Sequence, residues 1–236
     1  MKVLKKGGIL YKGFKRYLSL VEKYDLAKLY SLEEACAIVK ELATAKFDEP
    51  IRVSYHLNIK QKHNIRDVLV MPHSIGKQVR VLVFATGEKA TEAQKAGADY
   101  VGAEDLVEKI AGGWMDFDAV LATPDMMKIL GKIAPILGRA KMMPNPKTGT
   151  VTLDIAQGVK EFKAGKVEIR ADKTGNVHVV VGRKSLDTEK LIENVKAVHH
   201  VIMKNKPNDL KGDYIATMAL SPTMGPSVKV DHKKIS

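Results

Sequence analysis

Apolar and polar residues alternate in several segments near both ends of the chain, which is the pattern of strands that bury one face. The alternation is clearest over residues 51–60. Two further alternating runs flank a turn at residues 172–176 and predict a hairpin. Their apolar positions are Val167, Ile169, Ala171, Val177, Val179 and Val181. We expect the last strand at residues 214–220.

Apolar residues also recur at helical spacing in these end segments. Ser31 and Glu34 form a capping-box pattern, which predicts a helix over residues 32–46. A second helix is expected at residues 187–205, with His199 and His200 at a surface or an interface. Such helices could cover the apolar face of a sheet built from the strands of both ends.

The pattern changes in the middle of the chain, where short runs are apolar without alternation. Strands buried on both faces are expected at residues 79–84, 99–101 and 117–122. Helices are expected at residues 88–96, at residues 104–111 and after Thr123, where Pro124 suits a first helical turn. Residues 131–150 contain too much Pro and Gly for a long regular element. Strands that alternate with helices in this way are typical of a doubly wound, mostly parallel sheet.

These patterns predict a fold class that combines α/β and α+β in two domains. Neither end of the chain alone supplies enough strands and helices for two layers, so we expect both ends to fold together. Residues 1–67 and 161–236 would form a split α+β domain. Residues 68–160 would form an inserted, Rossmann-like α/β domain of three layers.

The charge of the chain is strongly basic and unevenly distributed. Lys and Arg number 39 against 27 Asp and Glu among 236 residues, which gives a net charge of +12. An excess of this size favours a polyanionic partner, because basic groups release the counterions that condense on phosphate chains. The predicted insertion is nearly neutral, with 11 basic and 10 acidic residues, so the split domain carries the excess.

Composition and motifs exclude several classes of function. The single Cys36 cannot form an internal disulfide, and we expect it to be a small buried hydrophobe in a protein of a reducing compartment. No run of apolar residues is long enough for a membrane span, and the basic first segment lacks the core of a signal peptide. We therefore expect a soluble, cytoplasmic protein.

The motifs of nucleotide-binding loops, catalytic zinc sites, paired cysteines and nucleophile elbows are missing from the chain. We therefore expect no cofactor, no metal and no catalytic residue. The alternative is a nucleotide-dependent enzyme built on the central domain. This alternative lacks the glycines that would hold a phosphate at a helix N-terminus.

Two loops of the split domain are candidates for contact with a polyanion. Lys46 and Phe47 place a cation beside an aromatic ring, although a Phe at a helix end is often a core residue. The segment at residues 221–226 is stiffened by two prolines, and Gly225 permits a close approach of the backbone. Its hydroxyl and amide groups suit a ribose or a phosphate, although such a loop can equally be a tight turn.

Eight segments of the chain share their sequence and order with one family. They are YSLEEA at residues 30–35, ELATAKFDE at 41–49, GKQVRVLVFATGEK at 76–89, AGADYVGAEDL at 96–106, GWMDFDAVLATPDMM at 113–127, MPNPKTGTV at 143–151, AGKVEIRADKTGNVH at 164–178 and SPTMGPSVKVD at 221–231. Through them the chain resembles the bacterial family of the large-subunit ribosomal protein L-one, the protein of the mobile stalk beside the tRNA exit site. Two segments depart from the relatives. At residues 137–147 LGRAKMMPNPK replaces the usual LGPRGLMPNPK, and residues 57–74, LNIKQKHNIRDVLVMPHS, lack the Gly and the Asp-Pro that relatives commonly carry before the inserted domain.

The resemblance implies a non-enzymatic constituent of the large ribosomal subunit, cytoplasmic, ribosome-associated and monomeric when free. Its split domain would bind large-subunit rRNA. The RNA-binding residues carried over from the family are Lys46, Phe47, Lys173, His178, Thr217, Thr223, Met224 and Gly225. The family also implies two further partners: tRNA at the exit site, whose release the stalk would assist, and the chain's own mRNA, whose translation it would repress.

Overall fold

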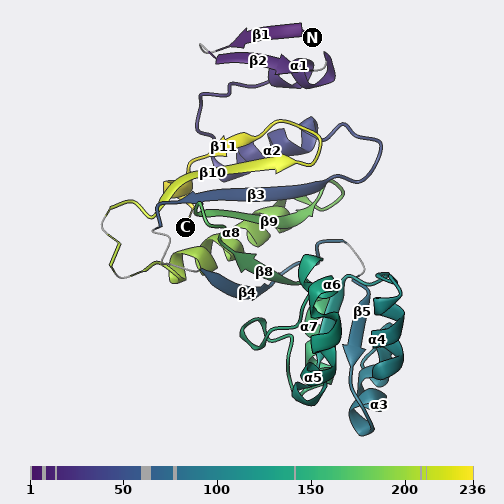
Figure 1. Cartoon of the computed structure of the whole chain (residues 1–236). Coiled ribbons are helices and arrows are strands. Elements are labelled where there is room, and N and C mark those ends of the chain that lie inside the picture. Colours follow the sequence, from purple (N-terminus) through teal and green to yellow (C-terminus); the bar gives the residue numbers. More distant parts are fainter. Residues whose placement is uncertain are drawn as a thin grey trace. The chain divides into compact units, whose positions relative to one another are not determined.

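The computed structural model describes residues 2–6, 9–13, 15–59, 65–76, 79–140, 142–207, 209–210 and 212–235. The chain is a mixed α/β protein with helices and several sheets, and it divides into two compact units (Figure 1). Unit 1 combines Met1–Gly76 with Ile169–Ser236, and unit 2 is Lys77–Glu168. The division differs from the predicted boundary at residue 160, which lies inside the helix α7 (Ile155–Ala164).

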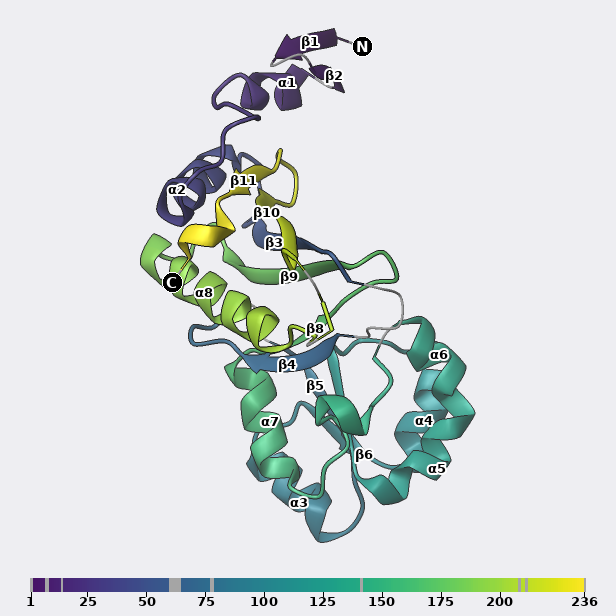
Figure 2. The ribbon, with the colours of Figure 1, turned by 90° about the vertical axis from the view of Figure 1, so that its left-hand side faces the viewer.

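The main sheet of unit 1 is antiparallel and has the order β11-β10-β3-β9. Its strands are β3 (Pro50–Leu57), β9 (Asn176–Arg183), β10 (Ile215–Pro222) and β11 (Val228–Val230). The helices α2 (Leu32–Leu42) and α8 (Thr188–Lys204) lie on the same side of this sheet (Figure 2). The predicted alternation of β3 is confirmed, since every second residue from Ile51 to Leu57 is buried against this helical layer.

The start of α2 is confirmed, but its end is not where the spacing predicts. Ser31 Oγ accepts from the amide of Glu34 at 3.3 Å, and the Glu34 carboxylate accepts from the amide of Ser31 at 3.3 Å. The helix stops at Leu42 instead of residue 46. The reason is local: the amide of Ala45 donates to the side chain of Glu49 at 2.7 Å, so the chain turns instead of continuing the helix.

The helix α8 has the predicted extent and packs its apolar stripe on the sheet. Within that stripe His199 is buried, with 8% of its surface exposed, so it is a core residue and the predicted surface or interface position is wrong. Its ring lies 6.0 Å from the ring of Tyr55 in β3, measured between centroids. Cys36 of α2 is fully buried, as predicted, and burial raises the pKa of its thiol to about 12.

The predicted hairpin around residues 172–176 is wrong. The strand β8 (Lys166–Arg170) pairs with β4 (Arg66–Val70) in a separate two-stranded sheet, and only an isolated bridge between Ala171 and Val177 joins the two arms of the turn. The strand β9 instead pairs with β3. Only Ile169 is buried in β8, so the apolar alternation there does not mark a strand of the main sheet.

The first described elements of the chain are the antiparallel strands β1 (Lys2–Lys6) and β2 (Ile9–Gly13), followed by the helix α1 (Lys15–Val21). A short 3₁₀ helix, η4 (His232–Lys234), lies near the other end. Among the described residues, every helix is too short or too polar to cross a bilayer.

Unit 2 contains a parallel sheet in the order β6-β5-β7. Its strands are β5 (Val81–Phe84), β6 (Tyr100–Gly102) and β7 (Ala119–Ala122). The helices α3 (Glu88–Lys95) and α7 cover one face, and α4 (Glu104–Ala111), α5 (Met127–Leu130) and α6 (Ala134–Arg139) cover the other (Figure 2). Each face has its own apolar cluster, around Phe84 and Ile110 on one side and around Val83 and Val159 on the other.

The connections of unit 2 are short. The helix expected after Thr123 begins with a 3₁₀ turn, η1 (Pro124–Met126), and continues as α5. Two more 3₁₀ turns, η2 (Gly131–Ile133) and η3 (Pro146–Thr148), lie in the segment predicted to lack a long regular element.

Candidate nucleic-acid interface

The face of the main sheet opposite α2 and α8 is polar, and we call it the open face. Its outward residues form three rows across β10, β3 and β9, because side chains alternate along each strand. The rows are Thr217–His56–Asn176, Ala219–Ser54–His178 and Ser221–Arg52–Val180. No helix of unit 1 covers this face in the described part of the chain, so these groups remain available to a partner.

Hydrogen bonds between strands fix two histidines of the open face. His178 Nδ1 lies 2.9 Å from Ser54 Oγ, and His56 Nδ1 lies 2.8 Å from Asn176 Oδ1. Both rings are exposed. Of the predicted RNA-binding residues, His178 and Thr217 therefore both belong to this face, where sequence reasoning missed Arg52, Ser54 and His56.

The turn at residues 172–176 holds Lys173 at one end of the open face. The carboxylate of Asp172 accepts from the amide of Asn176 at 2.7 Å and from the amide and hydroxyl of Thr174 at 2.9 and 2.8 Å. These hydrogen bonds lower the pKa of Asp172 to about 2, and the bond from the amide of Asn176 has the largest effect. Gly175 has a φ of +84°, and a Cβ there would lie 2.5 Å from the carbonyl oxygen of Leu57. The turn is therefore rigid, and Lys173 is exposed on it.

Two loops that contain most of the candidate residues, residues 45–49 and residues 223–227, are held together by the carboxylate of Glu49, and we call them the joined loops. This side chain is only 1% exposed. Its Oε1 accepts from the amide of Ala45 at 2.7 Å, and its Oε2 accepts from the amide of Met224 at 2.9 Å. A buried carboxylate is stable only when it is paired in this way. Sequence reasoning missed Glu49.

The joined loops present apolar side chains to solvent. Phe47 is 51% exposed and Met224 is 52% exposed, and Lys46 beside them is exposed as well. The alternative interpretation of Phe47 as a core residue is therefore wrong. Large apolar side chains that are held in solvent by a rigid backbone suit stacking on unpaired bases.

Thr223 and Gly225 have contacts within the protein. The hydroxyl of Thr223 donates to the carbonyl of Pro50 at 3.0 Å and keeps its lone pairs for another donor. A Cβ on Gly225 would lie 2.6 Å from Cγ of Pro222 and 3.2 Å from the carbonyl oxygen of Leu42. The close approach predicted at Gly225 is therefore made by the protein itself.

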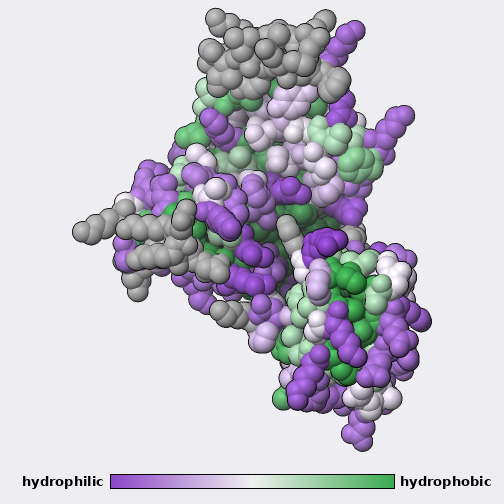
Figure 3. All heavy atoms as spheres, in the orientation of Figure 1, coloured by the Kyte–Doolittle hydropathy of each residue, from purple (hydrophilic) through white to green (hydrophobic). Residues whose placement is uncertain are grey.

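The helix α1 and the residues just after it are hydrogen-bonded to the same loop. The guanidinium of Arg16 donates to the carbonyl of Met224 at 2.8 Å, and the hydroxyl of Tyr24 donates to the carbonyl of Ser227 at 2.9 Å. Figure 3 shows the surface around the β10–β11 loop as pale, which corresponds to weakly polar residues. Sequence reasoning gave this helix no part in the site.

The basic charge of the chain is concentrated in unit 1. Unit 1 holds 26 Lys and Arg against 15 Asp and Glu, a net charge of +11, whereas unit 2 holds 13 against 12. The open face and the joined loops therefore belong to the unit whose field attracts a polyanion.

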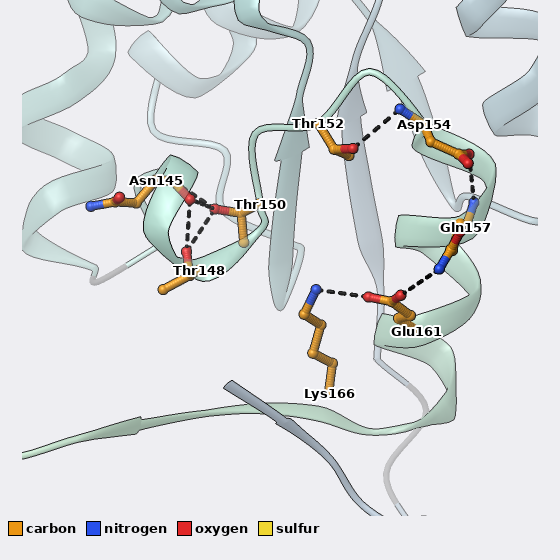
Figure 4. Close-up of polar contacts among 8 residues, drawn as sticks. All are labelled: Asn145, Thr148, Thr150, Thr152, Asp154, Gln157, Glu161 and Lys166. Atoms are coloured by element: carbon orange, nitrogen blue, oxygen red, sulfur yellow. Dashed lines mark hydrogen bonds and ion pairs between the residues drawn. The ribbon is translucent and has the colours of Figure 1, made fainter. Parts of the chain in front are cut away.

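The conspicuous motif of unit 2, residues 143–151, uses its polar groups internally (Figure 4). The carbonyl of Asn145 accepts from the hydroxyls of Thr148 and Thr150 at 2.9 and 3.0 Å. Nearby, Lys166 donates to the carboxylate of Glu161 at 2.8 Å, so its charge is neutralised by a neighbour. These contacts hold the segment in its fold.

No three His, Cys, Asp or Glu side chains within the described ranges converge in a way that could hold a metal ion. On the open face Ser54 is hydrogen-bonded to His178, but no carboxylate of the described residues bonds to this imidazole, so the orienting acid that covalent catalysis requires is missing there. Its hydroxyls, imidazoles and cations can instead form hydrogen bonds and ion pairs with ribose and phosphate groups.

Comparison with known proteins shows the family of this chain. The sequence profile of the Ribosomal protein L1p/L10e family matches residues 39–226. Two similar proteins are the large ribosomal subunit proteins uL1 of Streptococcus pyogenes serotype M3 (strain SSI-1) and serotype M5 (strain Manfredo). Each is 53% identical over 220 residues, which is 92% of this chain and 96% of the relative. The chain, with its basic split unit and its open polar sheet, therefore belongs to the Ribosomal protein L1p/L10e family.

Proposed function

We propose that unit 1 is the RNA-binding domain of this chain and binds large-subunit rRNA with its open face and joined loops. Membership of the family makes the chain a structural constituent of the large ribosomal subunit, ribosome-associated and not an enzyme. The observation that carries the proposal is the arrangement around Glu49, where one buried carboxylate holds the loops of Phe47 and Met224 together in a basic unit with an open sheet face.

The chemistry of the open face suits RNA of irregular shape. Sequence-specific readers of duplexes aim bidentate side chains at base edges, whereas here hydroxyls and imidazoles predominate. Such groups contact riboses and phosphates, and exposed rings stack on unpaired bases. We therefore propose a folded rRNA region with internal loops as the ligand, contacted by Lys46, Phe47, Lys173, His178, Thr217, Thr223, Met224 and Gly225.

The proposal includes the finer roles that the family resemblance implies. Unit 2 would be an inserted domain of the mobile stalk and would assist the release of deacylated tRNA from the exit site. The free chain would be a monomer that binds a similar fold in its own mRNA and represses translation. The resemblance supports these roles, and a translation assay with the chain's own mRNA as template tests the last of them: added protein should lower synthesis from that template only.

The test of rRNA binding compares a large-subunit rRNA fragment that contains the stalk region with a plain RNA duplex of equal length. The full chain should prefer the fragment, and its affinity should fall steeply with salt. Lys46→Gln should reduce the slope of log affinity against log salt by about one. Lys128→Gln, which removes an exposed lysine of unit 2, is the matched control and should leave the slope unchanged.

Thermal unfolding of the same protein with and without nucleotide tests the enzyme alternative. A nucleotide-dependent enzyme would be stabilised against heat by ATP or NAD, because a ligand that binds only the folded state raises its melting temperature. We expect no such shift. Stabilisation by a nucleotide, together with weak and salt-insensitive binding of the rRNA fragment, would contradict the proposed function.

A further inference from the structure

A shallow cavity of about 340 Å³ lies in unit 1 beside the joined loops. It is enclosed by Tyr17 of α1, by Arg52 of β3, and by the end of β10 with the loop that follows it. Its volume is at the lower end of the range for small-molecule pockets, so it suits one planar group of moderate size. None of these wall positions except the loop residues belongs to the RNA-binding set implied by the resemblance.

The walls of the cavity are fixed to one another before any ligand arrives. Tyr24 and Arg16 fasten the segment of α1 to the loop through the carbonyls of Ser227 and Met224, at 2.9 and 2.8 Å. Thr223 fastens the loop to Pro50 at 3.0 Å. A cavity held by three bonds between segments far apart in sequence is preformed, which reduces the entropy lost on binding.

The lining combines three kinds of group. The ring of Tyr17 and the prolines Pro222 and Pro226 supply apolar faces, and Ser221 and Ser227 supply hydroxyls. The side chain of Arg52 supplies one cation, which is exposed and has no hydrogen bond or ion pair with any described residue. A base can stack on the apolar faces, a ribose can bond to the hydroxyls, and a phosphate can pair with the guanidinium. An apolar peptide side chain would leave the guanidinium and the hydroxyls without partners.

We infer that this cavity receives a single unpaired nucleotide, turned out of the bound RNA, whose base stacks on Tyr17 and whose phosphate pairs with Arg52. The inference rests on the proposed function and deepens it. An RNA strand that crosses the open face meets Ser221 and Arg52 in the last row of that face, and both residues also line the cavity. The cavity therefore continues the open face.

The experiment is a double-mutant cycle between protein and RNA. Each unpaired nucleotide of the rRNA fragment is replaced in turn by an abasic one, and affinities are measured for the full chain and for Tyr17→Leu. Loss of a stacked base costs about tenfold in affinity. At one position, and only there, the abasic change should weaken the unchanged protein about tenfold and leave Tyr17→Leu unaffected. Tyr17→Phe keeps the ring, so the abasic change at that one position should still weaken its binding about tenfold. Arg52→Gln should lower affinity for every RNA that retains the phosphate.

The outcomes separate the two ideas. If the unchanged protein binds the fragment tightly but abasic and Tyr17→Leu effects add at every position, the cavity holds no base and the inference is wrong while the proposed function stands. The same holds if a Tyr17 variant with a native circular dichroism spectrum binds all RNAs as tightly as the unchanged protein. If the unchanged protein does not prefer the fragment over the duplex, both the proposed function and the inference fail.

Discussion

At the scale of single residues, the candidate interface separates groups that contact solvent from groups that hold them in place. Phe47 is half exposed, whereas Glu49, two residues further along the chain, is almost completely buried. The two side chains point to opposite sides of one short loop. Changes at these positions should therefore affect binding and folding in different proportions.

Phe47→Ala should weaken RNA binding without weakening the fold. An exposed ring contributes little to the free energy of unfolding, so we expect a change within about 0.5 kcal/mol. Loss of base stacking should lower affinity by about 1–3 kcal/mol. Leu153→Ala removes an apolar side chain of unit 2 that is 65% exposed and is the control, expected to change neither quantity. Chemical denaturation and filter binding measure the two effects, and equal RNA affinity of both variants would count against a role for Phe47.

Glu49→Gln should weaken both the fold and RNA binding. The amide keeps one acceptor oxygen for two backbone N–H donors, and its own NH₂ faces the second donor. An unpaired buried group costs about 1–3 kcal/mol in the free energy of unfolding. The loops should also lose their mutual placement, so affinity should fall with no change in salt slope. Glu41→Gln on α2 makes the same charge change at an exposed position and should be silent. A Glu49→Gln protein as stable as the unchanged one would show that the carboxylate does not join the loops.

At the scale of elements, the sequence predicts the local pattern of a helix or strand better than its contacts with other elements. The capping box of α2, the alternation of β3 and the apolar stripe of α8 depend on neighbours in sequence, and each is confirmed. The end of α2 and the partner of β8 depend on contacts with distant or neighbouring elements, and both predictions were wrong. The alternation in β8 carried no information on which strand pairs with it.

The same limit applies to the candidate interface. Residues that the family resemblance supplied, such as Phe47 and Thr217, are exposed on the joined loops or the open face. The resemblance did not supply Glu49 or Arg52, because their roles arise from the register of β3 with β10 and from hydrogen bonds between loops far apart in sequence. Such contacts leave no periodic pattern in either segment.

The packing of α8 on β3 should make unit 1 less stable in acid. The pKa of His199 lies below its usual 6.5, mainly because the ring is buried and also because His232 and His200 are near. Its buried Nδ1 has no hydrogen-bond partner among the described residues. The unfolded chain therefore binds a proton more readily than the folded chain, so stability is full above pH 6.5 and is lost as the pH falls below it. The ring of Tyr55, which faces His199, offers no compensating charge.

His199→Phe tests this expectation. The variant cannot titrate at that position, so its urea midpoint should decline less between pH 7.5 and pH 5.5 than that of the unchanged protein. His200→Gln is the control, because His200 is exposed on the same helix, and its midpoint should follow the unchanged protein. Parallel declines for His199→Phe and the unchanged protein would show that other groups cause the acid sensitivity.

At the scale of the whole molecule, the distribution of charge assigns the affinity for RNA to one unit. Unit 1 carries +11 of the net charge of +12, although it is interrupted by 92 residues of nearly neutral sequence. Counterion release depends on the number of cations at the phosphates, so the salt slope should be a property of unit 1 alone. In unit 2 the hydroxyls of Thr148 and Thr150 are bonded to the carbonyl of Asn145 within the same segment (Figure 4).

A shortened chain tests that division directly. Residues 77–165 are replaced by a flexible Gly-Ser linker, which leaves β8 in place to pair with β4. The shortened chain should fold, because the core formed by the main sheet, α2 and α8 lies entirely within unit 1. It should bind the rRNA fragment with the same salt slope and with an affinity within about tenfold of the full chain. A well-folded shortened chain whose salt slope falls by two or more would show that unit 2 supplies phosphate contacts, and the uneven charge of the sequence would then not mark the boundary of the RNA-binding surface.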